Sequence, residues 1–262
     1  MKLDLSTSNQ IIPIWKPVGM STHTISKGIS GLMGVPVAHT GTLDPMAEGV
    51  IVLLSGDIRY NKLEFAGWKK EYEFEMLFGL STDTYDPMGL LSATDLAFVL
   101  DEKRLRSALL SFQPAYTQTY PPFSAKRVNG KPMHYYAQRG ELEKVTAPTI
   151  EAQLYELEVL GSTKLSLRDF IAVIVPKISQ VEGFFRQEAI LNGWKEFSKN
   201  NNLDALVAVV KIRAVVSRGV YVRALTVDVA AKLGTRALTY SIVRTKNGDY
   251  SQADCYDLPT LT

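Results

Sequence analysis

The chain has 262 residues, of which 46% are hydrophobic, and its 29 Lys and Arg against 27 Asp and Glu give a formal net charge of +2. This is an ordinary globular composition, and a single cysteine and three histidines exclude disulfide frameworks and most zinc sites. No stretch approaches the roughly 18 apolar residues of a membrane span and residues 1–10 lack a secretory pattern, so we expect a cytoplasmic, metal-free protein in one domain.

The first half of the chain predicts strands and helices in mixed order. A strand at 11–15 is followed by a helix that Ser21 or Thr22 caps, and apolar residues share one face of that helix: Ile25, Ile29 and Leu32. A turn-rich loop at 38–49 precedes an apolar strand at 50–54 and a helix at 57–66. The next elements are a strand at 72–78, with Glu73, Glu75 and Leu77 on its wetter face, and a helix at 101–112.

The second half predicts strands at 154–160, 171–175 and 206–216. Helices are predicted at 180–197 and at 224–233, where Gly234 supplies the C-terminal cap of the second one. Because strands and helices do not alternate regularly, this order favours an α+β fold with an antiparallel or mixed central sheet flanked by helices.

The loop from His39 to Pro45 sets one carboxylate among small residues. Pro45 forces Asp44 into an extended backbone conformation, so the loop presents this carboxylate in a defined direction. An Asx turn, in which the Asp44 side chain bonds only its own backbone, accounts for the same pattern.

A second group of polar residues, 217–223, lies between the long apolar strand and the helix at 224–233. If the strand continues, Tyr221 and Arg223 are two residues apart and point the same way. The alternative is a tyrosine at the strand edge beside a solvated arginine.

The segment from Thr119 to Arg139 is strongly basic, although the net charge of the whole chain does not indicate a nucleic-acid partner. It contains no acidic residue and has a local charge of +4, from Lys126, Arg127, Lys131 and Arg139. Aromatic side chains are interleaved with these cations, namely Tyr120, Phe123, Tyr135 and Tyr136. Cations beside aromatic faces suit phosphates and bases of a nucleic acid, although a solvated basic loop fits equally well.

Together these residues resemble the TruB family of tRNA pseudouridine synthases. The motifs occur in the order of that family from about residue 11 to about residue 258: Lys16-Pro17-Val18-Gly19, His39-Thr40-Gly41-Thr42-Leu43-Asp44-Pro45, Lys70-Glu71-Tyr72, the 120–140 segment, Gly219-Val220-Tyr221-Val222-Arg223-Ala224-Leu225 and Ile242-Val243-Arg244-Thr245. One such motif is weak, whereas several in register are specific.

The resemblance implies the pseudouridine synthase fold and the isomerisation of uridine to pseudouridine at position 55 in the T-loop of tRNA, by base flipping and without a cofactor or metal. Residues 119–146 would be the RNA-binding insertion, and residues 161–204 form an extended insertion of unknown role. Because the chain stops soon after its last motif, we expect no PUA domain, no guide RNA and a monomer that binds the T-arm.

The resemblance also assigns roles to individual residues. Asp44 would be the catalytic carboxylate, which either adds covalently to the nucleotide or removes a ribose proton. Arg223 would keep that carboxylate ionised. Tyr72 would stack on the flipped uracil and assist removal of the carbon-bound proton, and Tyr221 would pack under the same base.

The remaining assigned residues bind the substrate less directly. His39 would take the place of the extruded base or stack in the RNA loop, with a purely structural histidine as the alternative. Ile242 would form an apolar wall, and Lys16 would either order the active-site loop or contact the substrate.

Two other functions fit the same residues. One is a non-catalytic tRNA-binding protein, such as a folding chaperone, that keeps the RNA contacts without the chemistry. The other is a synthase of the same family that acts on another RNA.

Overall fold

One mixed sheet organises the structure, and the computed structural model describes residues 3–261. The strands of this sheet are β1 (Ile11–Lys16), β2 (Val37–His39), β3 (Glu48–Ser55), β4 (Lys70–Phe78), β7 (Ala115–Thr119), β10 (Thr149–Ser166), β11 (Leu206–Val216), β12 (Ala237–Asn247) and β13 (Tyr250–Ser251). Their order is β1-β3-β12-β4-β11-β10-β7, with β2 beside β3 and β13 beside β12. Within the described residues these pairs are antiparallel except β12 with β3, which confirms the expected mixed sheet.

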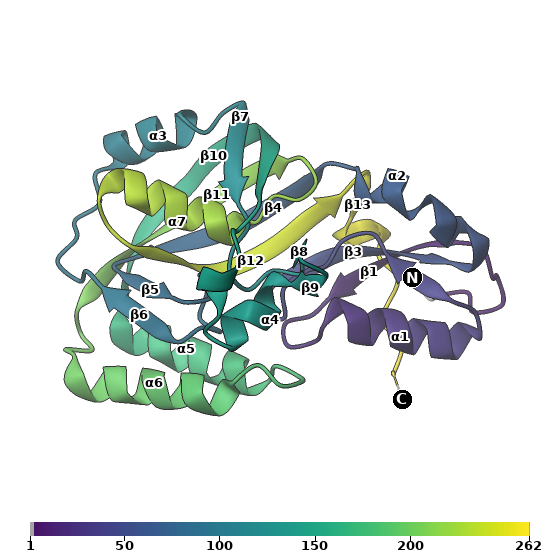
Figure 1. Ribbon diagram of the computed structural model, residues 1–262, viewed down its shortest axis with the longest axis horizontal. Coiled ribbons are helices and arrows are strands. Elements are labelled where there is room, and N and C mark those ends of the chain that lie inside the picture. The colour runs from purple at the N-terminus through teal and green to yellow at the C-terminus, as the bar shows by residue number, and fades with distance from the viewer. Residues whose placement is uncertain (1–2, 262) are drawn as a thin grey trace.

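Helices cover both faces of the sheet. They are α1 (Thr22–Met33), α2 (Lys62–Ala66), α3 (Glu102–Leu110), α4 (Met133–Gln138), α5 (Leu167–Ser179), α6 (Gln187–Asn200) and α7 (Val222–Leu233), with short 3-10 turns η1 (Gly56–Asn61), η2 (Leu142–Lys144) and η3 (Gln252–Asp254). In Figure 1, α3 and α7 lie on one side of the strands and the α5–α6 pair lies on the other. This arrangement confirms the α+β class. No helix in the described part of the chain is long and apolar enough to cross a membrane.

Two small ribbons sit outside the main sheet. One pairs β5 (Leu80–Thr82) with β6 (Leu91–Thr94), and the other pairs β8 (Arg127–Val128) with β9 (Lys131–Pro132). The second ribbon and α4 belong to the basic 119–146 segment, which crosses the middle of the view in Figure 1.

The local signals at α1 act largely as predicted. The Ser21 hydroxyl accepts a hydrogen bond from the Thr24 N–H at 2.9 Å, and Gly34 ends the helix in the left-handed conformation. Ile25 and Ile29 are fully buried, but Leu32 is 37% exposed, so the predicted apolar stripe was wrong at its last position.

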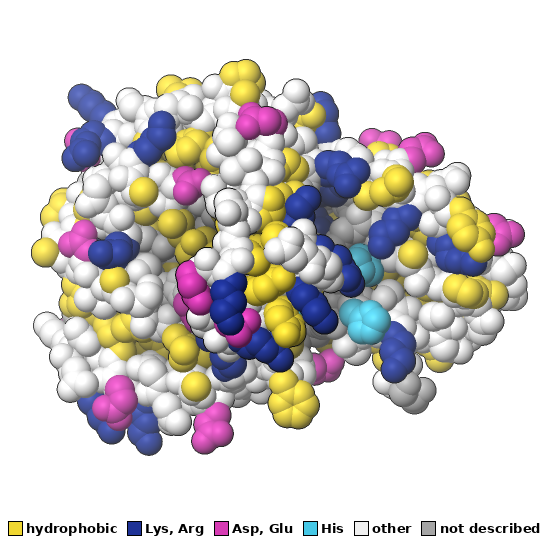
Figure 2. Space-filling view, viewed as in Figure 1, with side chains coloured by type: hydrophobic (Ala, Val, Ile, Leu, Met, Phe, Trp, Pro, Cys, Tyr) yellow, Lys and Arg dark blue, Asp and Glu magenta, His cyan; other side chains and the backbone are white. Residues whose placement is uncertain are grey.

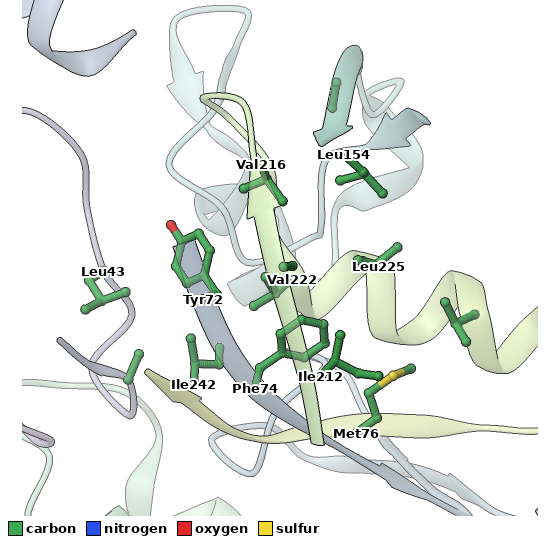
Figure 3. Close-up of a cluster of buried hydrophobic side chains, with 14 of the residues drawn as sticks. Leu43, Tyr72, Phe74, Met76, Leu154, Ile212, Val216, Val222, Leu225 and Ile242 are labelled. Carbon is green, nitrogen blue, oxygen red and sulfur yellow. The ribbon is translucent and has the colours of Figure 1, made fainter. Parts of the chain in front are cut away.

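The alternation along β4 places one face in the main core. Tyr72, Phe74 and Met76 point into that core together with Ile212 of β11 and Leu225 of α7, as Figure 3 shows. On the opposite face, Leu77 was predicted to be wetter and this was wrong, because it is fully buried in a second core that α5 and α6 complete.

The prediction of a strand at 171–175 was wrong, because these residues form the middle of α5. Their β-branched side chains favour a strand, but the residues that become buried recur at helical spacing: Leu167, Phe170, Ile174 and Ile178. The Ser166 hydroxyl accepts from the Asp169 N–H at 3.0 Å and caps the first turn. Burial of one helical face therefore outweighs the local strand preference.

Other predicted boundaries also move. The helix predicted at 180–197 begins only at Gln187, since Gly183 and Arg186 have φ values of +96° and +64° that interrupt a helix. The 57–66 helix is the η1 turn followed by α2. The strand β12 was not predicted, because polar residues face the interior within it and hide its periodicity: Thr239, Arg244 and Asn247.

The parallel contact between β3 and β12 depends on Gly49. Gly49 pairs with Arg244, and a Cβ atom on Gly49 would lie 2.3 Å from the Arg244 carbonyl oxygen and 2.6 Å from its nitrogen. Its φ of +126° is also outside the range of other residues. This contact holds the start of β3, and with it the loop that carries Asp44, next to β12.

We predict that Gly49→Ala lowers the free energy of unfolding by at least about 3 kcal/mol, because the backbones of β3 and β12 must separate. The measurement is urea denaturation followed by circular dichroism. Gly31→Ala is the matched control, since Gly31 lies within α1 with no atom near its Cβ position, and it is expected to gain up to about 1 kcal/mol. Equal stability of the two variants would contradict the proposed close approach.

Candidate active site

A bidentate ion pair joins Asp44 to Arg223 at the centre of the molecule. The Arg223 Nε donates to Asp44 Oδ2 at 2.7 Å, and its Nη2 donates to Oδ1 at 3.0 Å. The Arg223 side chain is only 4% exposed, whereas that of Asp44 is 28% exposed. Both carboxylate oxygens thus accept from a residue 179 positions away, so Asp44 does more than close a local Asx turn.

Arg223 reaches this position from a helix, not from a strand. The strand β11 ends at Val216, Tyr221 is the N-cap residue of α7, and Arg223 lies in the first turn of that helix. The expectation that Tyr221 and Arg223 share one face of a continuing strand was therefore wrong. The glycine turn before the helix redirects the chain so that both side chains still reach the site.

The Nη nitrogens of the Arg223 guanidinium also bind two backbone carbonyls. Its Nη1 donates to the Thr84 carbonyl at 2.6 Å and its Nη2 to the Phe123 carbonyl at 3.2 Å, while Asp86 Oδ2 lies 3.8 Å from Nε. Burial alone would lower the pKa of Arg223, but the carboxylates of Asp44 and Asp86 raise it overall. The cation is permanent, and its planar donors define the direction of Asp44.

Two residues from the first motif and from α1 hold the Asp44 loop. Thr22 Oγ1 accepts from the Leu43 N–H at 3.0 Å. Lys16 is fully buried and its ammonium donates to the carbonyls of Pro17, Met20 and Pro45 at 2.7, 2.8 and 3.3 Å. Burial lowers the pKa of Lys16 to about 8. Lys16 lines neither of the cavities described below, and its contacts order the loop.

A cavity of about 270 Å³ opens beside Asp44. It is lined by Asp44, by Tyr72 of β4, by Ile242 of β12 and by Tyr221 at the start of α7. Figure 3 shows Leu43, Tyr72 and Ile242 approaching one another from three segments that are distant in the sequence. The structure thus brings these predicted residues to one place, with a carboxylate at one wall and apolar or aromatic groups around it.

Gln118 fixes the position of Tyr221 and was not predicted. The Tyr221 N–H donates to Gln118 Oε1 at 2.8 Å, and Gln118 Nε2 donates to the Tyr221 carbonyl at 3.0 Å. The Tyr120 ring meets the Tyr221 ring edge-on at 5.8 Å. Burial raises the pKa of Tyr221 to about 12, so its phenol stays neutral. No local signal separates the fully buried Gln118 from the polar residues around it in β7.

Sequence reasoning also missed the roles of Lys70 and Arg244, which line the same cavity. Arg244 is buried, and its guanidinium donates to the carbonyls of Val50, Thr42 and Gly41 at 2.6, 3.4 and 3.3 Å. Burial, with the charge of Arg244 nearby, lowers the pKa of Lys70 to about 8. Both residues belong to the family motifs described above, and membership of those motifs was the only sequence signal for a role in the site.

A second cavity, of about 420 Å³, also borders Asp44 and is lined in addition by Arg223. All three histidines of the chain line it: His23, His39 and His134. The Nδ1 atom of His39 is buried and has no hydrogen-bond partner among the described residues. Burial, aided by nearby cations, lowers the pKa of His39 to about 4, so its ring is neutral.

The four predicted basic residues lie exposed on the 119–146 segment: Lys126, Arg127, Lys131 and Arg139. Lys126 Nζ lies 5.0 Å from the centre of the Tyr120 ring, and the Arg139 guanidinium lies 3.9 Å from that of Tyr135. In Figure 2, dark blue side chains gather over the middle of this face, next to the cyan histidines. The charge and the cavities therefore share one face.

Residues of the 161–204 segment contact the turn that carries Thr84 and Asp86. Trp194 of α6 donates its indole N–H to the Pro87 carbonyl at 3.1 Å, and Arg186 binds both oxygens of Asp83 at 2.8 and 3.2 Å. Between these two anchors lie Thr84 and Asp86, which contact Arg223. The insertion thereby contributes to the position of the central cation.

Asp86 is a second carboxylate in the site and was not predicted. It accepts from the Thr84 hydroxyl at 2.6 Å and from the Met88 N–H at 2.9 Å. Burial raises its pKa to about 6, although Arg223 acts in the opposite direction. Ionisation of Asp86 therefore adds charge beside Arg223 as the pH approaches neutrality.

Comparison with known proteins gives consistent matches. Residues 32–173 match the family described as TruB family pseudouridylate synthase (N terminal domain). The tRNA pseudouridine synthase B of Caldanaerobacter subterraneus subsp. tengcongensis is 29% identical over 96% of this chain and 73% of its own length. The protein of the same name from Listeria welshimeri is 31% identical over 97% of this chain and 71% of its own length.

Solved structures share the fold. A chain of a Cbf5-Nop10-Gar1 complex has a TM-score of 0.59 at 18% sequence identity over 96% of this chain. A chain of an H/ACA RNP bound to a substrate RNA containing 2'-deoxyuridine has a TM-score of 0.54 at 17% identity, also over 96% of this chain. The present chain spans about half of each, 52% and 51%.

We predict that Asp86 makes the folded state less stable as the pH rises. The folded-state pKa of about 6 lies above the ordinary 3.8, so the stabilisation is fully present below pH 3.8 and is lost through pH 6. Between pH 4.5 and 7 the wild type is expected to lose roughly 2 kcal/mol relative to Asp86→Asn. Urea denaturation of both proteins at several pH values measures this, and parallel pH profiles would contradict it.

Proposed function

Because the chain belongs to the TruB family of pseudouridylate synthases, we propose that it converts uridine 55 in the T-loop of tRNA to pseudouridine with Asp44 as the catalytic carboxylate. The chain has the pseudouridine synthase fold and is an isomerase that acts on uridine in tRNA. The observation that carries the finer proposal is the bidentate Asp44–Arg223 pair at the edge of a cavity lined by Tyr72 and Ile242.

The proposed reaction needs an ionised carboxylate at a fixed position. Arg223 supplies a permanent positive charge and two parallel donors, which set the direction of the Asp44 carboxylate. Each carboxylate oxygen retains a lone pair, and the side chain is 28% exposed, so it can reach a nucleotide in the cavity. Asp44 either adds to the nucleotide or removes a ribose proton. Both routes lead to cleavage of the glycosidic bond between the ribose and the nitrogen of the base.

The detached base must then turn inside a closed space and rejoin the ribose through carbon. We assign the stacking face to Tyr72, whose ring borders the cavity beside Asp44, and the apolar wall to Ile242. We also assign to the Tyr72 phenol a role in removing the proton from the carbon that forms the new bond. Tyr221, a neutral phenol held by Gln118, limits the space in which the base turns.

Extrusion of the uridine costs a few kcal/mol of stacking, which contacts to the RNA must offset. We assign that role to the neutral His39 ring, which can occupy the vacated space, and to phosphate contacts from the basic residues of the 119–146 segment: Lys126, Arg127, Lys131 and Arg139. Lys16 acts indirectly by ordering the loop that carries Asp44.

The proposal extends to the context in which the protein works. Residues 1–262 would act as one catalytic domain with the insertions 119–146 and 161–204, as a monomer in the cytoplasm where its tRNA substrate resides. The steps above use only side chains of this chain, so they invoke no cofactor, metal or guide RNA.

The primary test maps pseudouridine in unmodified tRNA after incubation with the purified protein. We predict product at the T-loop uridine, and a loss of at least about a thousandfold in kcat for Asp44→Asn with tRNA affinity within about threefold of wild type. Asp204→Asn is the matched control, because Asp204 pairs with Arg168 at the surface, and it is expected to keep full activity.

Other results of this mapping experiment would change the proposal in different ways. Product at another position or in another RNA would replace position 55 as the target. Folded wild-type protein that binds tRNA without forming product would favour the non-catalytic RNA-binding function. Unchanged activity of Asp44→Asn would remove Asp44 from the mechanism.

We further predict that Arg223→Lys lowers kcat at least about a hundredfold, because one ammonium cannot replace the two parallel donors to Asp44 together with those to Thr84 and Phe123. Single-turnover kinetics measures the effect, and circular dichroism verifies that the variant is folded. A loss below about threefold in a folded variant would show that charge alone, without bidentate geometry, suffices.

A further inference from the structure

Phe184 is the most exposed large apolar side chain among the described residues, at 102% of its reference area. It lies in the connection between α5 and α6, residues 180–186, which we call the insertion tip. In Figure 1 this connection projects from the ends of the two helices, beneath α4. Single exposed apolar residues are common, so exposure alone assigns no role and the surroundings must decide.

The insertion tip is held in one conformation by hydrogen bonds. The side chain of Gln187 accepts from the Phe185 N–H at 2.8 Å and donates to the carbonyls of Val181 and Gly183 at 3.1 and 2.6 Å. The Glu182 N–H also donates to the Gly19 carbonyl, at 3.0 Å, which ties the tip to the first motif. These bonds fix the backbone on either side of Phe184, which lowers the entropy lost when a partner binds the tip.

Arg186 anchors the tip next to the active site. Besides its bidentate pair with Asp83, its guanidinium lies 4.5 Å from the centre of the Phe123 ring. The charge of Arg186 is therefore compensated within the protein. What the tip offers to a ligand is mainly an aromatic face and not a free cation.

The tip shares its cavity with the proposed catalytic carboxylate. Phe184, Phe185 and Arg186 line the cavity of about 420 Å³ that contains Asp44, and His134 and Gln138 of the basic segment also line it. The basic 119–146 segment and the insertion tip thus border one cavity, and an RNA in that cavity contacts both. The basic segment suits its phosphates, and Phe184 suits a base.

We propose that Phe184 stacks on an unpaired base of the bound tRNA beside the target uridine, so that the insertion tip and the basic segment hold the RNA from two sides. This inference rests on the proposed function in that the ligand is RNA. Every base has a π-face, so this contact would add affinity without reading the sequence. It would also give the 161–204 insertion a direct role in substrate binding.

The test compares Phe184→Ala, Phe184→Trp and wild type with unmodified tRNA. Phe184→Ala is expected to raise Kd and KM about tenfold with kcat within about twofold, and Phe184→Trp to restore both. The dependence of log Kd on log salt should keep its slope in Phe184→Ala, because no phosphate contact is lost, whereas Lys131→Ala should reduce that slope.

The matched control is Val99→Ala. Val99 is 85% exposed and lines a separate depression that shares no residue with the two site cavities, so its removal should leave Kd and KM unchanged. As a direct readout, tRNA should quench the fluorescence added by Phe184→Trp but not that added by Val99→Trp. Because Phe184 is fully exposed, its substitution is expected to leave folding unchanged, and thermal denaturation of each variant checks this.

Unchanged Kd and KM in Phe184→Ala, or no recovery in Phe184→Trp, would overturn the inference. A wild-type protein that forms no pseudouridine while Phe184→Ala still weakens tRNA binding would instead reject the proposed reaction and retain the stacking contact. The two failures are therefore distinguishable.

Discussion

The Arg223 guanidinium is the group on which the architecture of the site depends. A buried cation is tolerated only when its charge and its donors are satisfied, because an unpaired one costs several kcal/mol. Three separate segments meet this requirement: the Asp44 loop, the Thr84–Asp86 turn and the Phe123 carbonyl. Folding of each segment around one cation places the proposed catalytic carboxylate, a second carboxylate and the start of the basic segment within reach of one another.

The 161–204 segment is linked to that cation indirectly, through the turn at residues 83–87. Through Trp194 and Arg186 it holds both ends of the turn that contains Thr84 and Asp86. The same insertion buries Leu77 on the second face of the sheet. The connection between α5 and α6 also lines the cavity that contains Asp44, through Phe184, Phe185 and Arg186.

The net charge of +2 does not show that the cations fall into a buried group and an exposed group with different roles. Lys16, Lys70 and Arg244 are buried, and they donate to backbone carbonyls of loops around the site. Such cations stabilise irregular backbone. The exposed cations of the 119–146 segment keep their charge at the surface, beside aromatic rings that can stack on bases. Location, more than total charge, therefore suits this protein to RNA.

The sequence by itself determined the features that short-range physics controls. The Ser21 cap, the alternation in β4 and the loop that displays Asp44 follow from neighbouring residues, and the ordered motifs identified the family. The tertiary structure alone decided which apolar run becomes the helix α5, that polar β12 occupies the middle of the sheet, and that Gln118 and Asp86 join the site. The physical reason is distance along the chain: the energy of a buried polar group or an apolar face depends on partners a hundred or more residues away, and no local pattern specifies those partners.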